Sequence, residues 1–508
     1  MPTLQGKLEI ADFDKTIFKN EHVQLHKDII ERVQNSFDFL KEFSENKIIY
    51  GVNTGFGPMA QYKIKDDERI QLQYNLIRSH ASGTGNAIPA AYVRAAMLAR
   101  LNTLSLGNSG VHPSVIKLMG ELLNKDIIPL IYEHGGVGAS GDLVQLAHLA
   151  LVLIGEGEVF YKGERRKTEE IFKLENLQPI KVELREGLAL MNGTSVMTGI
   201  GVVNVLYTKQ IMQWMIKASS AINEIVKAYD DHLSLELNET KMHVGQRKIA
   251  EMMRTHLKDS NLTRKREHHL YNNSSKEEVF VEKVQEYYSL RCVPQILGPV
   301  LDTLNSVEKI LIEEVNSAND NPIVDVEKRH VYHGGNFHGD YVSLEMDKLK
   351  IVVAKMTMLA ERQLNYLLNS KLNDILPPFV NLGKLGLNFG MQGVQFTATS
   401  TTAESQMLSN PMYVHSIPNN NDNQDIVSMG TNAALITKKV IENAFEVVAI
   451  ELITIVQAIE YLKVQDSVSS ETKKMYNEIR KIVPVFKEDV VMYPYVNSVK
   501  EFLMDSVK

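Results

Sequence analysis

Apolar residues recur every three or four positions along several long stretches of the chain, which places them on one face of an α-helix. The clearest stretch is 430–462, where charged side chains fall between the apolar positions. Its apolar positions are Ala433, Ile436, Val440, Ala444, Val447, Ile450 and Ile453. The stretches 199–233, 295–315 and 341–368 show the same spacing. The pattern predicts long helices that pack together as a bundle.

The first part of the chain differs, because its elements are short and glycine-rich segments separate them. These segments are 51–57, 82–85, 107–110 and 135–141. We therefore expect a loop-rich domain over residues 1–195 and a long helical bundle over residues 196–508. The expected fold class is mainly α, with a long central helical bundle and a loop-rich N-terminal part. Exposed apolar faces on such helices favour an oligomer.

Composition and charge argue against several functions. The 508 residues carry a net charge of -7 without the basic surface that nucleic acid or an anionic membrane requires. The most apolar stretch, 447–459, is too short and too polar to cross a bilayer. Cys292 is the only cysteine, and the first residues do not resemble a signal peptide. We expect a cytoplasmic protein that binds neither nucleic acid nor a membrane.

Residues 135–142 read Gly-Gly-Val-Gly-Ala-Ser-Gly-Asp and contain a tripeptide that can form an electrophile. If the amide nitrogen of Gly141 attacks the carbonyl carbon of Ala139 and the carbonyl oxygen leaves as water, and Ser140 loses its hydroxyl as a second water, a five-membered methylidene-imidazolone forms. Such a ring is a strong carbon electrophile, which no ordinary side chain provides. Glycine is needed because ring closure uses backbone angles that a Cβ disfavours. An Ala-Ser-Gly sequence alone is common, so the hypothesis depends on the rest of the chain.

Three other chemistries have weaker support. His330, His333 and His338 lie close together, but glycines separate them and no carboxylate pairing accompanies them, so we expect no metal site. No glycine-rich segment has the spacing of a phosphate-binding loop or a dinucleotide fingerprint, so we expect no nucleotide. A nucleophilic role for Ser140 stays open, although its neighbours do not form a Gly-x-Ser-x-Gly elbow.

Six short motifs occur along the chain in an order that identifies a family. They are 50–57 (Tyr-Gly-Val-Asn-Thr-Gly-Phe-Gly), 138–142 (Gly-Ala-Ser-Gly-Asp), 192–194 (Asn-Gly-Thr), 288–291 (Tyr-Ser-Leu-Arg), 337–339 (Phe-His-Gly) and 423–425 (Asn-Gln-Asp). Together they resemble the aromatic amino acid lyases, a family that holds histidine, phenylalanine and tyrosine ammonia-lyases and related aminomutases. The resemblance implies that Ala139, Ser140 and Gly141 form the methylidene-imidazolone without a metal or an added cofactor. It also implies a mostly helical homotetramer whose active sites draw residues from more than one chain.

The resemblance assigns roles to single residues. Tyr50 corresponds to the catalytic base on a glycine-flanked lid loop, and Arg291 to the guanidinium that holds the substrate carboxylate. Tyr288 and Asn192 correspond to groups that line the electrophile and the substrate amine. Phe337 is expected to pack near the ring. The surrounding polar shell is expected to contain Gln285, Asn423 and Glu404.

Two positions bear on the identity of the amino acid substrate, and they favour different answers. Ser79-His80 is similar to the pair in histidine ammonia-lyases, where the histidine faces the substrate ring. Gln424 is the residue of phenylalanine and tyrosine lyases, at a position where histidine lyases carry a glutamate. His80 and Asn420 are the expected partners of a para-hydroxyl group. We therefore expect L-tyrosine as the small-molecule substrate, with trans-p-coumarate and ammonia as products.

Two alternatives stay open from the sequence. One is a histidine ammonia-lyase that forms urocanate, and the other is a tyrosine 2,3-aminomutase that keeps the ammonia and adds it back. The residues are also compatible with contact between the electrophile and either the amine or the aromatic ring of the substrate.

Overall fold

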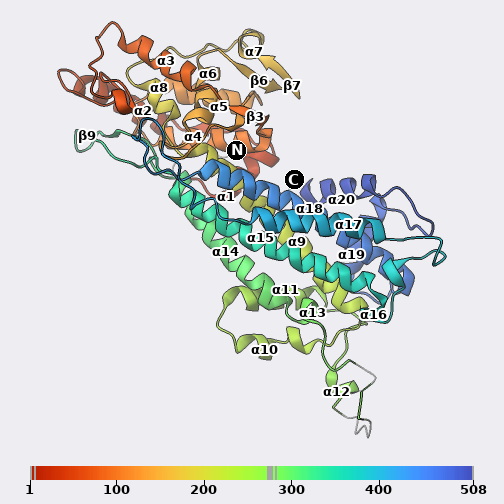
Figure 1. Cartoon of the computed structure of the whole chain (residues 1–508). Helices are drawn as coiled ribbons and strands as arrows, with labels where there is room; N and C mark the ends of the chain where they lie inside the picture. The colour runs from red at the N-terminus through yellow and green to blue at the C-terminus, as the bar shows by residue number, and fades with distance from the viewer. Residues whose placement is uncertain (1–2, 5–6, 272–277, 281–282, 506–508) are drawn as a thin grey trace.

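The computed structural model describes residues 3–4, 7–271, 278–280 and 283–505. Its longest helices lie side by side as an elongated bundle, and the N-terminal part of the chain covers one end of that bundle (Figure 1). The short helix α13 (Tyr288–Arg291) lies toward the other end (Figure 1). The expected mainly α fold, with a long helical bundle and a loop-rich N-terminal part, is confirmed.

The N-terminal part consists of short helices joined by loops and small sheets of two or three strands. Its helices are α1 (Ile10–Phe18), α2 (Lys27–Phe43), α3 (Arg69–His80), α4 (Ala90–Ser105), α5 (Pro113–Asn124), α6 (Leu143–Leu153), α7 (Thr168–Glu175) and α8 (Glu186–Met191). Its strands are β1 (Thr3–Leu4), β2 (Gln24–Leu25), β3 (Thr84–Ala87), β4 (Ile128–Pro129), β5 (Tyr132–His134), β6 (Glu158–Tyr161) and β7 (Glu164–Lys167). Strand β3 pairs with β5, β4 with β6, and β6 with β7, all antiparallel, whereas β1 and β2 are parallel.

The remainder of the chain forms the bundle and the helices around it. These helices are α9 (Ser195–Ile225), α10 (Leu235–Glu239), α11 (Val244–His256), α12 (Arg266–His269), α14 (Val293–Val315), α15 (Asp340–Leu368), α16 (Ser370–Asn373), α17 (Gln392–Leu408), α18 (Gly430–Leu462), α19 (Ser470–Ile482) and α20 (Tyr493–Asp505). Strands β8 (Ile323–Asp325) and β9 (His330–Tyr332) form an antiparallel hairpin between α14 and α15.

Helix α18 is the centre of the bundle. It packs against α9, α15, α17 and α20, and every residue from 447 to 459 is buried. The apolar character of this stretch therefore comes from protein neighbours on all of its faces. Among the helices that the structure describes, none is long and apolar enough to cross a membrane.

The apolar spacing located three of the four long helices within two residues at each end. The expectation of a helix over 199–233 was wrong, because α9 spans Ser195–Ile225. Lys227 adopts a left-handed backbone conformation with φ +55°, and the amide of Ala228 donates to the carbonyl oxygen of Asn223 at 2.9 Å. This arrangement satisfies carbonyls at the end of the helix and turns the chain away from its axis.

Three bundle helices, α9, α15 and α18, begin at the end that the N-terminal part covers (Figure 1). Helix α4 of the N-terminal part packs against α9, so the hydrophobic core continues from one part into the other. The division into residues 1–195 and 196–508 stays a prediction, although α9 begins next to it. The candidate site lies where the two parts meet.

Candidate active site

The tripeptide 139–141 lies in a tight turn. Gly141 has φ +70°, and a Cβ at this position would lie 2.0 Å from the carbonyl oxygen of Gly193. The amide of Asp142 donates to the same oxygen at 2.7 Å, which holds the two segments together. Ala139 is buried, whereas Ser140 lines a cleft. The turn fits the proposed cyclisation, because only glycine is tolerated at the residue that would supply the nitrogen.

The carboxylate of Asp142 joins the tripeptide to the starts of two long helices. It accepts hydrogen bonds from the amides of Val196 and Met197 at 2.8 and 2.9 Å. Both amides belong to the first turn of α9 and lack partners within the helix. The hydroxyl of Thr431 in α18 donates to the other carboxylate oxygen. Burial raises the pKa of Asp142 to about 6, and these hydrogen bonds limit the increase.

The N-termini of three long helices converge beside the tripeptide. Asp142 accepts from the first turn of α9, as described above. Gly339, immediately before α15, donates its amide to the carbonyl oxygen of Gly138 at 3.1 Å. Met429, immediately before α18, donates to the carbonyl oxygen of Val137 at 3.0 Å. Since each helix N-terminus carries roughly half a positive charge, this convergence favours negative charge that develops at the tripeptide.

A cleft of about 670 Å³ opens over Ser140. The predicted site residues that line it are Tyr50, His80, Ser140, Asn192, Phe337, Asn420, Asn423 and Gln424. Its apolar walls include Phe56, Met59, Leu72, Leu76, Leu143 and Leu188. Among the described residues that line the cleft, none is Asp, Glu, Lys or Arg. The cleft therefore suits an aromatic side chain, but one chain alone supplies no cation for a carboxylate.

Two side-chain amides contact Ser140. Asn192 donates to the Ser140 carbonyl oxygen at 3.0 Å, and Gln424 donates to the Ser140 hydroxyl oxygen at 3.0 Å. The buried guanidinium of Arg100 in turn donates to the backbone carbonyl of Asn192 at 2.9 Å. Burial lowers the pKa of Arg100 to about 10, so it stays charged at neutral pH. Gln424 thus lies beside the residue that would lose its hydroxyl.

Tyr50 begins the lid, which we define as residues 50–57. Its hydroxyl oxygen accepts from the amide of Gly57 at 3.1 Å, so the lid closes on itself. Its own amide donates to Nε2 of His333 at 3.4 Å, and the amide of Gly51 donates to the hydroxyl of Thr54 at 3.2 Å. These contacts hold the lid in a defined conformation with Tyr50 among the cleft residues.

His80 is the last residue of α3 and lines the same cleft. Its Nδ1 lies 3.0 Å from the carbonyl oxygen of Leu76, which can only accept a hydrogen bond. Nδ1 also lies 3.0 Å from the hydroxyl oxygen of Ser79, which can donate or accept, so each tautomer of His80 satisfies one of these contacts. Asn420 approaches the lid from the loop before α18, since a Cβ on Gly57 would lie 2.8 Å from its side-chain nitrogen.

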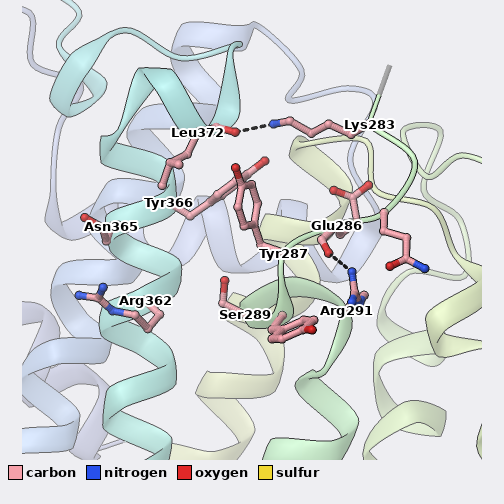
Figure 2. Close-up of a pocket in the computed structure, with 11 residues that line it drawn as sticks. Lys283, Glu286, Tyr287, Ser289, Arg291, Arg362, Asn365, Tyr366 and Leu372 are labelled. Carbon is pink, nitrogen blue, oxygen red and sulfur yellow. Dashed lines mark hydrogen bonds between the residues drawn. The ribbon is translucent and has the colours of Figure 1, made fainter. Parts of the chain in front are cut away.

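Tyr288 and Arg291 do not line this cleft. They lie in a second pocket, of about 690 Å³, where Arg291 donates to the carbonyl oxygen of Glu286 at 2.6 Å (Figure 2). Tyr366 of α15 lines this pocket, whereas α15 begins at Asp340 beside the cleft. A helix rises about 1.5 Å per residue, so the two places are roughly 40 Å apart along α15. Within one chain the predicted site is therefore divided.

The adjacent tyrosines of the second pocket have different surroundings. The ring of Tyr287 packs 5.5 Å from the ring of Tyr366, between centroids. Tyr288 is 70% exposed, and the guanidinium of Arg291 lies 4.5 Å from its ring centroid. Of the two adjacent tyrosines, Tyr288 is therefore the one whose ring lies against Arg291.

The remaining candidates are dispersed. Gln285 lines the second pocket, whereas Glu404 lies on α17, where Lys439 is 3.4 Å away.

The three histidines also have separate neighbours. His330 contacts the rings of Phe43 and Tyr332, His333 contacts Tyr50, and His338 faces Asp340. In the part of the chain that the structure describes, no group of three or more His, Cys, Asp or Glu side chains is placed to hold a metal ion.

Comparison with known proteins decides the family. A family model described as aromatic amino acid lyase matches residues 8–481. The chain belongs to the aromatic amino acid lyase family. The resemblance drawn from the six motifs is thereby confirmed.

Relatives of this aromatic amino acid lyase carry out more than one reaction. The chain is 38% identical to a histidine ammonia-lyase of Caldanaerobacter subterraneus, over 97% of the chain and 94% of the relative. It is 39% identical to a tyrosine 2,3-aminomutase of Myxococcus sp., over 90% of the chain and 88% of the relative. The crystal structure of a tyrosine aminomutase from Streptomyces globisporus matches it with a TM-score of 0.94 and 33% identity, covering 100% and 98% of the two chains. The names of these relatives thus cover two activities, that of a histidine ammonia-lyase and that of a tyrosine aminomutase.

Neither Arg100 nor the role of Asp142 was predicted from the sequence. Asp142 is the last residue of the motif 138–142, but the amides that donate to its carboxylate lie 54 and 55 residues further along the chain. No local spacing connects a carboxylate with the start of so distant a helix. Arg100 lies in the interior of α4, where its charge is the one signal that distinguishes it from its apolar neighbours.

Proposed function

We propose that the protein eliminates ammonia from L-tyrosine and releases trans-p-coumarate. The observation that carries this proposal is the neutral polar lining of the cleft, in which His80 can pair with a phenolic hydroxyl, a group that both donates and accepts. Gln424 presents an amide where a carboxylate would be needed as the charged partner of an imidazole. The apolar walls suit the aromatic ring.

We propose further that Ala139, Ser140 and Gly141 form the methylidene-imidazolone. When formed, the ring supplies a carbon electrophile that makes a poor leaving group easier to expel. Asn192 and Gln424, which contact Ser140, hold this part of the site in place.

Tyr50 is the proposed base that removes a β-proton of the substrate. The Gly57 amide donates to its hydroxyl oxygen, so this oxygen is already oriented as a hydrogen-bond acceptor.

The active form is proposed to be a homotetramer with shared active sites. The cleft of one chain offers no Lys or Arg among its described lining residues, yet the substrate carboxylate requires a cation. Arg291 lies at the other end of the bundle, half-buried beside the exposed ring of Tyr288. Arg291 and Tyr288 of a second copy are therefore proposed to complete each cleft.

Subunit mixing tests this sharing. Tyr50→Phe and Arg291→Met homotetramers should each be nearly inactive. After subunit exchange, about a quarter of the sites should contain both wild-type residues, because each site draws the two from different chains. Activity that stays absent after verified exchange would mean that one chain supplies both residues.

A tyrosine 2,3-aminomutase is the second candidate. It is favoured by hydrogen bonds that join the lid to residues 62–64. The amide of Gly55 donates to the carbonyl of Tyr62 at 2.9 Å, and that of Ile64 to the carbonyl of Asn53 at 3.1 Å. A lid that opens slowly would retain ammonia long enough for it to add again. With L-tyrosine as substrate, equal amounts of p-coumarate and ammonia support the lyase, whereas early β-tyrosine supports the aminomutase.

A further inference from the structure

We infer that Gln73 is a positioning residue that holds the lid against the wall of the cleft. Gln73 lies in α3, and its side chain is 0% exposed. A buried amide is costly unless its donor and acceptor are both paired. Gln73 has two partners, and both are backbone groups of elements that line the cleft. The inference rests on the proposed role of Tyr50 as the base.

The two hydrogen bonds have unambiguous directions. Nε2 of Gln73 donates to the carbonyl oxygen of Gly51 at 3.1 Å, and Oε1 accepts from the amide of Leu188 at 3.2 Å. A carbonyl only accepts and an amide only donates, so these partners fix the orientation of the side chain. Leu188 is the third residue of α8, and its amide therefore has no partner within the helix. One side chain thus caps α8 and holds the residue that follows Tyr50.

The backbones of the lid, α3 and α8 approach one another closely at this point. Gly51 has φ +78°, and a Cβ there would lie 2.6 Å from Cδ2 of Leu188. A Cβ on Gly187 would lie 2.7 Å from the carbonyl oxygen of Gln73. Glycines at both positions permit this approach, so the amide of Gln73 reaches both backbones. Asn192, which contacts Ser140, immediately follows α8. Gln73 therefore links the base on the lid to the segment that supports the tripeptide.

The backbone next to the base is held from two directions. The amide of Tyr50 donates to His333, which immediately follows β9, and the carbonyl of Gly51 accepts from Gln73. Loss of the hydrogen bond between Gln73 and Gly51 should widen the range of positions that the Tyr50 hydroxyl occupies. It removes no group that touches the substrate. We expect kcat to fall about tenfold, the effect of one buried hydrogen bond left unmade. KM should change less than about twofold, because no binding contact is lost.

Gln73→Glu isolates the bond to Gly51. An ionised carboxylate still accepts from the amide of Leu188 but offers no proton to the carbonyl of Gly51. When the carboxyl group is protonated it can donate again, and burial shifts that protonation upward into an accessible pH range. The kcat of Gln73→Glu relative to wild type should therefore increase as the pH is lowered. Gln73→Met, which can make neither bond, should lose activity at every pH.

Gln71→Glu is the matched control. Gln71 lies in the same helix, is exposed, and donates to the side chain of Asn75 at 2.8 Å. Its kcat relative to wild type should not vary with pH. The titratable side chains of the lid, α3 and the start of α8 are Tyr50, Arg69, Tyr74, Arg78, His80, Arg185 and Glu186. All variants share these groups, so their titration cancels in the ratio.

Amide hydrogen exchange of residues 49–57 supplies a readout that does not depend on turnover. Exchange should be about tenfold faster in Gln73→Met, and in Gln73→Glu at high pH, than in wild type. Intact mass checks that the ring has formed in each variant, and thermal unfolding checks the fold. If Gln73→Glu fails to fold, Gln73→Met, which buries no charge, carries the exchange and kcat measurements.

Two results would overturn the inference. One is lid exchange at the wild-type rate in folded Gln73→Met, and the other is a relative kcat of Gln73→Glu that does not change with pH. Turnover is measured with whichever amino acid the wild type uses. If Tyr50→Phe keeps its turnover, the proposed base is wrong, and the exchange rates still decide whether Gln73 holds the lid.

Discussion

Replacing Gly141 with alanine tests the requirement for glycine at the turn that would form the ring. The residue has φ +70°, and the new Cβ would lie 2.0 Å from the carbonyl oxygen of Gly193 and 2.3 Å from its carbon. Both neighbouring atoms belong to the backbone, so no side-chain rotation relieves the contact. The segments must separate, and the hydrogen bond from the amide of Asp142 to Gly193 must lengthen or break.

The expected loss of stability in Gly141→Ala has two contributions. The left-handed conformation costs a non-glycine residue about 1 kcal/mol, and loss of the bond between Asp142 and Gly193 costs about 1 kcal/mol more. We therefore expect Gly141→Ala to lower the free energy of unfolding by about 2 kcal/mol. Ring formation should fail, because the displaced nitrogen no longer meets the carbonyl carbon of Ala139.

Gly163→Ala is the matched control for this experiment. Gly163 has φ +81°, and a Cβ there meets no atom within 4 Å. The control should lose about 1 kcal/mol of stability from backbone strain alone and keep full activity. Intact mass measures the outcome, since the wild-type chain should weigh two waters less than its sequence and Gly141→Ala should not. If a Gly141→Ala chain loses both waters and turns over at the wild-type rate, the turn does not require glycine at residue 141.

Further expectations concern the base, the carboxylate partner and substrate choice. Tyr50→Phe should lower kcat at least about 100-fold while substrate still binds, measured by steady-state kinetics and equilibrium binding. Arg291→Met should raise KM as well as lower kcat/KM by about 100-fold, because the carboxylate loses a bidentate partner. His80→Phe should lower kcat/KM for tyrosine about tenfold or more and raise the relative value for phenylalanine. Gln424→Glu should raise the relative kcat/KM for histidine, since it adds a carboxylate beside the ring.

The first three of these expectations have a control or a contradicting outcome. Tyr62→Phe, at an exposed tyrosine close to the lid, should leave kcat unchanged. If Tyr50→Phe keeps most of its turnover, another group removes the proton. If Arg291→Met leaves KM unchanged, the carboxylate is bound elsewhere. If His80→Phe affects tyrosine and phenylalanine equally, His80 does not contact the hydroxyl.

The long helices could be predicted because their apolar residues follow the helical period over many turns. Helices α14, α15 and α18 show this, whereas the end of α9 depends on the left-handed conformation of Lys227, which the period does not report. The motif residues around Ser140 were found because family resemblance connects distant segments. Their meeting in one cleft with Tyr50 is a property of the fold alone.

The burial of Gln73 and the position of Arg291 could not be predicted, because they depend on contacts that leave no local pattern in the sequence. Gln71 and Gln73 look alike in the sequence, yet one is exposed and the other is fully buried between the lid and α8. Arg291 lies far from Ser140 because α15 is 29 residues long and separates the two ends of the bundle. Neither the burial of a single glutamine nor the distance between two motifs can be read from residue spacing.

The most direct test of the central claim is competition between L-tyrosine and L-histidine for the wild-type enzyme. Equal concentrations are supplied together, and p-coumarate, urocanate, β-tyrosine and ammonia are measured by mass spectrometry and an ammonia assay. We expect p-coumarate and ammonia in equal amounts, with urocanate formed far more slowly. Urocanate formed faster than p-coumarate would contradict the assignment of tyrosine, and would mean that Ser79-His80 reports the substrate better than Gln424.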